Sequence, residues 1–287
     1  MPYLEDFIAH LAEYPALFGG VIFIFGVCIG SFLNVVIYRL PLMIQSELAG
    51  YTTSEGELDE YLGKQNLNLA FPRSFCTHCR TNLGWTDNIP VFSYLKLGGK
   101  CKYCQAPIGI KYPAIELLSG LVTLILGIYF GCSIKFLLSC VLLYALIALY
   151  FIDLNTFLLP DALTIPLIWC GMLVNSFNVF TPLKESLYGA VLGYLILWLV
   201  YWVFKFFTGK DGFGFGDFKL LSALGAWLGF GALPFIVFIS SLSGSLIGLG
   251  LIYFKKIGKN SPMPFGPYLI MGGVVMLLYP ELIHFLY

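Results

Sequence analysis

The stretch LIALYFIDLNTFLLPDALTIP, residues 146–166, decides the class of fold. An apolar segment runs up to Asp153, a short break follows, and Asp161 precedes the next apolar segment. Carboxylates beside apolar segments are costly at membrane depth and by default indicate a function. The stretch therefore predicts successive membrane helices with acids near one edge of the bilayer.

The composition of the whole chain supports a membrane protein. Apolar residues make up 59% of the 287 residues and charged residues only 11%, whereas soluble domains carry about 25% charged residues. So few charges would not cover the surface of a soluble domain of this length. The formal net charge is zero, so nothing indicates a nucleic-acid partner.

Eight apolar segments recur along the chain, and we expect an all-α polytopic membrane protein with about eight transmembrane helices. A spanning helix needs about 20 apolar residues, and most segments reach that length. The sixth is short, so seven or nine helices remain alternatives. The segments are 17–38, 114–131, 134–152, 162–180, 187–207, 218–230, 232–254 and 264–286.

Lys and Arg residues are distributed unevenly between the loops. Fourteen of the 16 lie in the regions 39–112, 205–219 and 255–260, and only Lys135 and Lys184 lie in the alternate loops. Positive charge favours the cytoplasmic side, so these three regions are predicted to face the cytoplasm and the N-terminus to lie outside. The missing basic residues at the start of the chain argue against a cleaved signal peptide.

A long polar region separates the first apolar segment from the others. We expect three parts: an N-terminal segment with the first helix (1–39), a cytoplasmic insert (40–112) and a membrane core (113–287). The insert holds two C-x2-C pairs with 21 residues between them, a spacing typical of zinc ribbons. The four predicted metal ligands are Cys76, Cys79, Cys101 and Cys104.

The predicted metal is a structural Zn²⁺ ion. Four thiolates complete a tetrahedral zinc shell and leave no open position for catalysis. Metal binding would supply much of the folding free energy of so small an insert. Two disulfides or four free thiols are the alternatives, but a reducing cytoplasm disfavours disulfides.

Four acids lie beside the apolar segments, and three of them have an ordinary structural explanation. Asp161 follows Pro160, and we favour it as the N-cap of the next helix over a functional role. Glu116 and Asp217 fit first helical turns, where the helix dipole favours an acid. Asp153 lacks such an explanation, because the dipole disfavours an acid at the C-terminal end of a helix.

The predicted topology places Asp153 and Asp217 at the same depth, at the cytoplasmic edge of the membrane. Two carboxylates at close range share one proton, so that one acts as an acid and the other as a base. Such a pair activates a water and protonates a leaving amine, which is the chemistry of aspartic peptidases. No Ser–His pair competes, because His10 and His284 lie at the outer ends and His78 lies in the insert.

Glycines lead up to Asp217 in the stretch GFGFGDFKLL, residues 212–221. Gly214 and Gly216 free the backbone to approach an extended substrate closely, so we regard them as candidate substrate-binding residues. A flexible loop is the alternative, because a lone G-x-G-D motif is weak evidence. Lys219 is a third candidate for substrate binding, although reaching the membrane interface or tuning the acid pair are equally open roles.

Several separated stretches resemble one family, the type IV prepilin peptidases. GSFLNVVIYRLP (30–41) is similar to the family's N-terminal signature, and the cysteine-containing stretch 73–104 to its cytoplasmic zinc motif. FIDLNTFLLPDALTIP (151–166) resembles the motif of the first aspartate, and GFGFGDFKLLSALGAWLG (212–229) the G-x-G-D motif. Two further similar stretches are YPAIELLSG and PMPFGPYL. The departures are small: Thr77 stands where the family often has proline, and the first loop of the insert is long.

The resemblance implies cleavage of prepilins and of type II secretion pseudopilins after a glycine, at the cytoplasmic face of the bacterial inner membrane. It implies Asp153 and Asp217 as the catalytic residues, with Glu116 and Asp161 as possible supporting residues. Many members also N-methylate the new N-terminal residue with S-adenosylmethionine, and the zinc insert is expected to support that step. The implied partners are the precursors, the lipid bilayer and the pilus or type II secretion assembly machinery. No Rossmann-type cofactor motif is present, so methylation is expected from the resemblance alone.

Three other functions are alternatives. An ion-coupled transporter would place acids near the bilayer midplane and would show repeated halves, and the sequence shows neither. Another G-x-G-D membrane protease, one that cuts within a helix, would place its acids deeper in the span. A zinc-bearing scaffold for pilus assembly would process its partners normally without the two aspartates.

Overall fold

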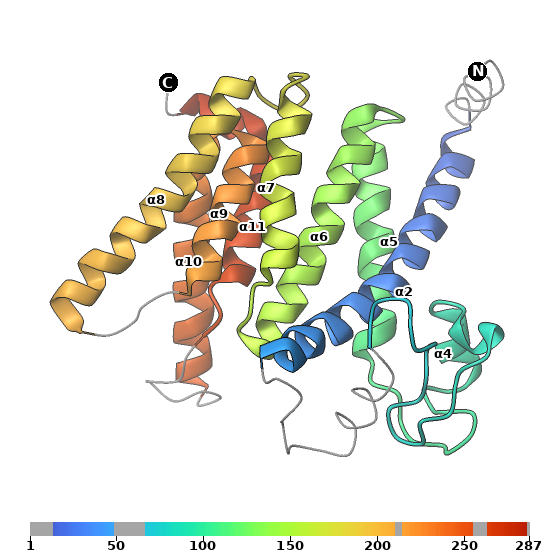
Figure 1. Cartoon of the computed structure of the whole chain (residues 1–287). Helices are drawn as coiled ribbons and strands as arrows, with labels where there is room; N and C mark the ends of the chain where they lie inside the picture. The colour runs from blue at the N-terminus through green and yellow to red at the C-terminus, as the bar shows by residue number, and fades with distance from the viewer. Residues whose placement is uncertain (1–13, 49–66, 210–213, 255–262, 286–287) are drawn as a thin grey trace. The chain divides into compact units, whose positions relative to one another are not determined.

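The computed structural model describes residues 14–48, 67–209, 214–254 and 263–285, and its regular structure there is helical (Figure 1). The chain divides into two compact units, residues 1–148 and 149–287. The elements are α2 (Pro15–Leu48), η1 (Trp85–Asn88), α4 (Phe92–Lys96), α5 (Lys111–Phe130), α6 (Ile134–Thr156), α7 (Asp161–Asn175), α8 (Leu183–Thr208), α9 (Phe215–Leu228), η2 (Phe230–Ala232), α10 (Leu233–Tyr253), α11 (Gly266–Leu278) and η3 (Pro280–Phe285).

Helices occupy all eight predicted apolar segments, and among the described residues five of them are long and apolar enough to cross a membrane. These five spans are Pro15–Ser46, Lys111–Phe130, Ile134–Thr156, Leu183–Thr208 and Phe230–Tyr253. Helices α7 and α11 are apolar but shorter, and α9 has 14 residues. The all-α prediction is confirmed, and the apolar helices make the chain a multi-pass membrane protein.

In the first unit, α2 packs along α5. The two helix backbones come together at Gly30, where an added Cβ would lie 2.7 Å from Cα of Glu116. The hydrophobic effect does not drive helices together within lipid, so their association depends on close packing. Small residues at the contact allow that close approach. Glycine at position 30 therefore permits the close packing of α2 against α5, the two helices that flank the insert.

The insert between α2 and α5 contains short helices but no β-hairpin in its described part. The first cysteine pair is flanked by an isolated antiparallel bridge from Phe75 to Asn82, and the second by one from Lys100 to Pro107. Arg39 of α2 is buried and donates hydrogen bonds to backbone oxygens of the insert, at 2.9 and 2.7 Å. The zinc-ribbon-like arrangement of two knuckles is confirmed, while η1 and α4 fill the space between them.

Helix α9 is the buried centre of the second unit, with α7, α8 and α11 packed around it. Its side chains Phe218, Leu220, Leu224 and Trp227 are fully buried. The closest packing is against α8, where a Cβ on Gly225 would collide with the backbone of Gly189. A helix enclosed by other helices needs no lipid contact, which explains why a short helix of 14 residues is stable here.

Polar side chains fix the C-terminal end of α9. The last carbonyls of a helix lack partners within the helix, and here Asn175 donates from Nδ2 to the oxygens of Ala226 and Trp227, at 2.8 and 3.0 Å. The Ser186 hydroxyl also donates to Ala226. These bonds fix the position of α9 along its axis, and therefore the position of the acid in its first turn.

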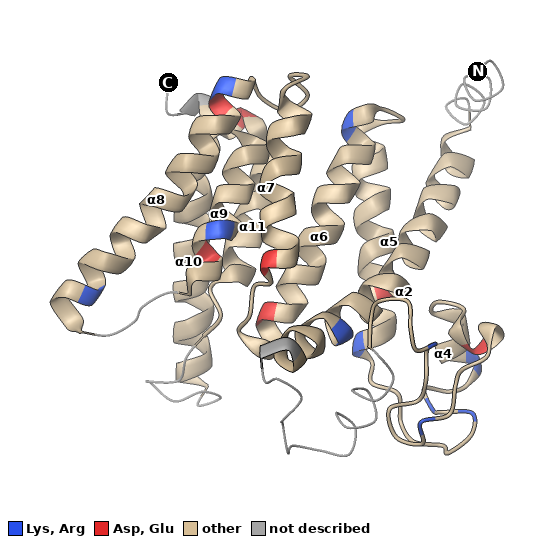
Figure 2. Ribbon diagram, in the orientation of Figure 1, with Lys and Arg blue, Asp and Glu red and all other residues tan. Residues whose placement is uncertain are grey.

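Among the described residues of the second unit, the charged side chains lie near the ends of α6, α7, α8 and α9 and in η3, with long uncharged stretches between them (Figure 2). Large apolar side chains are exposed along α8 and α10, including Trp202 and Leu249. Exposed apolar surface of this extent suits a lipid environment.

Candidate functional site

Asp153 lies near the C-terminal end of α6 and is only 4% exposed. Its Oδ2 atom is buried and has no partner of hydrogen-bond geometry among the described residues. The backbone N–H of Gly266 faces the carboxyl group. A buried carboxyl oxygen without a partner is rare, and this one lies against the backbone at the start of α11.

Asp217 is the third residue of α9 and is 6% exposed. Its place in the first turn of the helix is as predicted, and its Oδ2 accepts a hydrogen bond of 3.2 Å from the N–H of Gly214 at the N-cap. The same bond fixes the orientation of the carboxylate. Capping and chemistry are therefore compatible roles for Asp217.

The structure brings Asp153 and Asp217 together within the second unit, close enough for their charges to interact. Asp153 comes from the end of α6, and Asp217 from the start of α9. The backbone of Gly266, the first residue of α11, completes the surroundings of Asp153. Three helix ends thus meet around two buried carboxyl groups.

Asp161 is not the N-cap of α7, and the expectation from the sequence was wrong. Pro160 occupies the N-cap position without a side-chain cap, and Asp161 is the first helical residue. Both oxygens of Asp161 instead accept hydrogen bonds from Nζ of Lys219, at 2.6 and 2.8 Å. The ammonium group of Lys219, on α9, is a charged donor, and charge-assisted hydrogen bonds are stronger than those from a backbone N–H.

Glu116 also lies elsewhere than expected. Helix α5 begins at Lys111, because Pro113 is tolerated within a first turn, so Glu116 lies beyond that turn. It belongs to the first unit and is buried, and its Oε2 accepts a 2.7 Å hydrogen bond from the N–H of Val91 in the insert. Val91 has φ of 60°, an unfavourable conformation for a β-branched residue. Glu116 therefore anchors a strained turn of the insert rather than the start of its own helix.

The four predicted cysteine ligands meet in the insert, and their sulfur atoms lie within 4.8 Å of one another. The Sγ–Sγ distances are 3.8 Å between Cys76 and Cys104 and 4.0 Å between Cys79 and Cys101. A tetrahedral ion with sulfur ligands at about 2.3 Å separates the sulfurs by about 3.8 Å. The cluster therefore fits a metal ion.

The thiols of this cluster differ in acidity. Hydrogen bonds from Thr81 lower the pKa of Cys79 to about 6, which favours the thiolate that binds metals. At Cys104 the Ala106 N–H lowers the pKa, but desolvation and the neighbouring thiols raise it to about 11. Four thiolates repel one another, and a bound cation would remove that repulsion.

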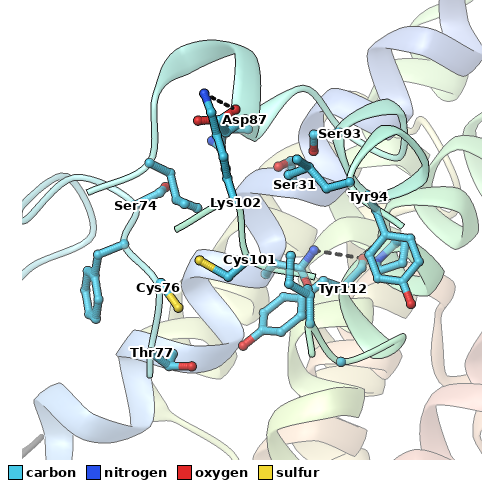
Figure 3. Close-up of a pocket in the computed structure, with 18 of the residues that line it drawn as sticks. Ser31, Ser74, Cys76, Thr77, Asp87, Ser93, Tyr94, Cys101, Lys102 and Tyr112 are labelled. Carbon is cyan, nitrogen blue, oxygen red and sulfur yellow. Dashed lines mark hydrogen bonds and ion pairs between the residues drawn. The ribbon is translucent and has the colours of Figure 1, made fainter. Parts of the chain in front are cut away.

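A cavity of about 240 Å³ adjoins the cysteine cluster in the first unit. It lies between α2, the insert and the start of α5, and Cys76 and Cys101 form part of its wall (Figure 3). Tyr94 and Tyr112 line it, as does Asp87, which pairs with Lys102 at 3.5 Å. Aromatic rings with a few polar groups are typical of small-molecule sites, and the volume is somewhat below the usual lower limit of about 300 Å³.

Comparison with known proteins decides the family. The model of the bacterial peptidase A24 N-terminal domain matches residues 24–130, and that of the type IV leader peptidase family matches residues 140–249. The prepilin leader peptidase/N-methyltransferase of Aeromonas hydrophila is 46% identical over 268 residues, which cover 93% of this chain and 92% of that protein. The chain belongs to the type IV leader peptidase family.

Other relatives agree with this assignment to the type IV leader peptidase family. The prepilin leader peptidase/N-methyltransferase of Pseudomonas aeruginosa is 40% identical over 281 residues, which cover 98% of this chain and 96% of that one. The protein of the same name in Stutzerimonas stutzeri is 42% identical over 274 residues, with 96% and 95% covered. No solved structure matches the chain.

Reasoning from the sequence missed two residues around the acids of this family member. Gly266 lies against Asp153, and the buried side chain of Leu159 lies against both Gly216 and Gly266. The glycine between Phe265 and Pro267 was a visible feature of the PMPFGPYL stretch, since a glycine in an apolar segment often marks a close approach. Nothing in the sequence distinguished Leu159 from its apolar neighbours.

Proposed function

We propose that the protein is a membrane aspartic endopeptidase that removes the leader peptide from prepilins and pseudopilins after a glycine. We further propose that it N-methylates the new N-terminal residue with S-adenosylmethionine. The observation that carries the peptidase is the pair of buried carboxyl groups of Asp153 and Asp217, which share one unit. Relatives named prepilin leader peptidase/N-methyltransferase along nearly the whole chain support both activities.

The acid pair performs the cleavage by moving protons. With one proton between the two carboxyl groups, the ionised one takes a proton from a water, and the water oxygen attacks the scissile carbonyl carbon. The protonated one then donates its proton to the leaving amine as the C–N bond breaks. The proposed position of that water is between the two carboxyl groups, and the Gly214 N–H keeps Asp217 oriented.

Candidate substrate contacts surround the start of α9. Gly214 is exposed and its backbone borders the carboxylate of Asp217, so an extended peptide can approach there. Lys219 keeps 28% of its side chain exposed while it pairs with Asp161. Gly216 has no side chain, so the backbone of the G-x-G-D turn lies close to Leu159 in the α6–α7 connection.

We propose a structural Zn²⁺ in the cluster of four cysteines. Its role is to hold the two knuckles of the insert together, since four thiolates leave no open position for hydrolytic chemistry. Residues 40–112 then form a metal-stabilised part between the first helix (1–39) and the membrane core (113–287). The proposed hydrolytic chemistry belongs to the acids alone.

We propose the cavity of the first unit as the place for the methyl donor. S-adenosylmethionine carries a sulfonium cation, and the rings of Tyr94 and Tyr112 can stabilise a cation above their faces. The carboxylate of Asp87 lies on the same wall, where it pairs with Lys102. When bound, the donor supplies an electrophilic methyl group, and the role of these residues is to hold it.

The distribution of Lys and Arg supports an orientation in the bacterial inner membrane. We propose that the insert and the acid pair face the cytoplasm and that the N-terminus lies outside. The substrates of a prepilin peptidase then reach the acids from the cytoplasmic face. Pilus or type II secretion assembly machinery would take up the processed products.

One assay tests both activities. We expect the detergent-solubilised protein to shorten a purified prepilin and to transfer a labelled methyl group from S-adenosylmethionine to the shortened product. Tyr94→Ala is expected to weaken S-adenosylmethionine binding about tenfold, measured by calorimetry, because one face of the cation site is lost. Cleavage should persist in this variant.

Tyr103→Ala is the matched control for the cavity, because Tyr103 lies in the same insert, is exposed and does not line the cavity. It should bind S-adenosylmethionine as the wild type does. Absence of leader cleavage by the wild type would overturn the peptidase. Unchanged donor binding by Tyr94→Ala would overturn the cavity assignment and leave the peptidase intact.

Gly266→Ala is expected to lower leader cleavage about 100-fold, because a small displacement of a catalytic group has effects of that size. The added Cβ would lie 2.5 Å from Oδ2 of Asp153, so the carboxyl group must move. Gly250→Ala in α10 is the control, since nothing lies within 4 Å of its added Cβ. Initial rates on a prepilin measure the effect, and wild-type rates for Gly266→Ala would contradict it.

A further inference from the structure

The connection between α6 and α7, residues 157–160, is short and held at both ends. Phe157 directly follows α6 and has φ of 56°, and its N–H donates to the backbone carbonyl oxygen of Asp153 at 2.9 Å. At the other end, the carboxylate of Asp161 binds Lys219 through both oxygens. The connection therefore has a fixed position beside Asp153 and the first turns of α9.

Leu159 and Pro160 are the buried residues of this connection. Leu159 is only 8% exposed, whereas Phe157 is 57% exposed. A Cβ on Gly216 would lie 2.7 Å from Cβ of Leu159, and a Cβ on Gly266 would lie 3.2 Å from its Cδ1. The isobutyl group therefore fills the space between two glycine backbones.

Both glycines adjoin the acid pair. Gly216 immediately precedes Asp217, and the Cβ position of Gly266 lies 2.5 Å from Oδ2 of Asp153. A single apolar side chain thus packs against the residue before Asp217 and against the glycine beside the carboxyl group of Asp153. Protein interiors are close-packed, so an additional methyl group in this space would need Leu159 or a neighbouring backbone to move.

We infer that Leu159 is a specificity-determining residue that restricts the residue before the scissile bond to glycine. This inference rests on the proposed function. The scissile carbonyl must reach the acids, and the α-carbon that carries it then lies against the isobutyl group of Leu159. A glycine fits there because it has no side chain, whereas the methyl group of alanine meets Leu159. Steric discrimination by one methyl-sized group has a typical size of about 10–200-fold.

The test compares two substrates that differ only in the residue before the scissile bond, glycine in one prepilin and alanine in the other. Wild-type protein should cleave the glycine substrate at least about tenfold faster. In Leu159→Ala, the ratio of kcat/KM between the glycine and alanine substrates should fall at least about tenfold. The ratio cancels any uniform loss of active protein, so a structural effect alone would leave it unchanged.

Leu197→Ala is the matched control, because Leu197 is equally buried in α8 but touches neither glycine. Its substrate ratio should equal that of the wild type. Leu159→Val removes less volume and replaces Leu159→Ala if that variant is not recovered; its ratio should fall by a smaller factor.

Two negative outcomes have different meanings. If the wild type cleaves the glycine substrate but the ratio stays constant in the Leu159 variants, the inference about Leu159 is overturned and the peptidase stands. If the wild type cleaves neither substrate, the proposed function itself is overturned, and the inference falls with it.

Discussion

Asp153→Asn and Asp217→Asn are each expected to lower leader cleavage about 10³-fold, the usual range for removing a positioned acid or base. An amide neither takes a proton from water nor donates one to a leaving amine. The two carboxyl groups act as a unit, so either substitution alone should remove most of the activity, and the double variant should add little. Prepilin shortening by purified variants, followed over time, measures the effect.

A third acid provides the control for this experiment. Glu185 also lies in a first helical turn of the second unit, where Thr181 donates to its carboxylate at 2.9 Å. Glu185→Gln should cleave as the wild type does, because this carboxylate has no part in the acid pair. If either aspartate variant inserts normally and cleaves at the wild-type rate, the assignment of Asp153 and Asp217 as a catalytic pair is wrong.

Cys101→Ser is expected to reduce the bound zinc of the purified protein from about one ion per chain to nearly none. Cys101 is the most buried of the four clustered cysteines, and a serine hydroxyl is a poor zinc ligand. Structural zinc typically contributes about 10–16 kcal/mol of apparent binding free energy, so the insert should lose its fold. Elemental analysis gives the zinc content, and limited proteolysis of the full chain reports the state of the insert.

Cys132→Ser serves as the control, because Cys132 is an exposed cysteine of the same unit outside the cluster. It should keep the zinc and the protease resistance of the wild type. Wild-type protein purified without zinc would contradict the metal assignment. Loss of cleavage that follows the metal content while the fold is intact would contradict a purely structural role.

Much of the candidate site was predictable because it depends on local features of the sequence. Two C-x2-C pairs identify a metal cluster from spacing alone, and the structure brings those four sulfurs together. Counting apolar segments and their alternating direction predicted that Asp153 and Asp217 lie together, and the structure places both acids in the second unit. Each of these predictions uses only residue type, spacing and the thickness of a membrane.

The interaction partners of Asp161 and Glu116 could not be predicted from residue type and spacing. Asp161 was expected to cap its own helix, yet it binds Lys219, which lies 58 residues away. Glu116 was expected at the start of its helix, yet it accepts the N–H of Val91. Local capping rules compare a side chain with its own helix, whereas here each acid binds a group that tertiary packing brings from a distant part of the chain.

The sequence by itself determined the membrane class, the cysteine cluster and which two acids are proposed as a pair, because hydropathy and spacing act along the chain. Only the tertiary structure decided what surrounds those acids: Gly266 beside Asp153, and Leu159 between the two glycines. Those neighbours depend on how helix ends from distant parts of the chain meet. Close packing, which is a property of three-dimensional contacts and not of residue order, selects them.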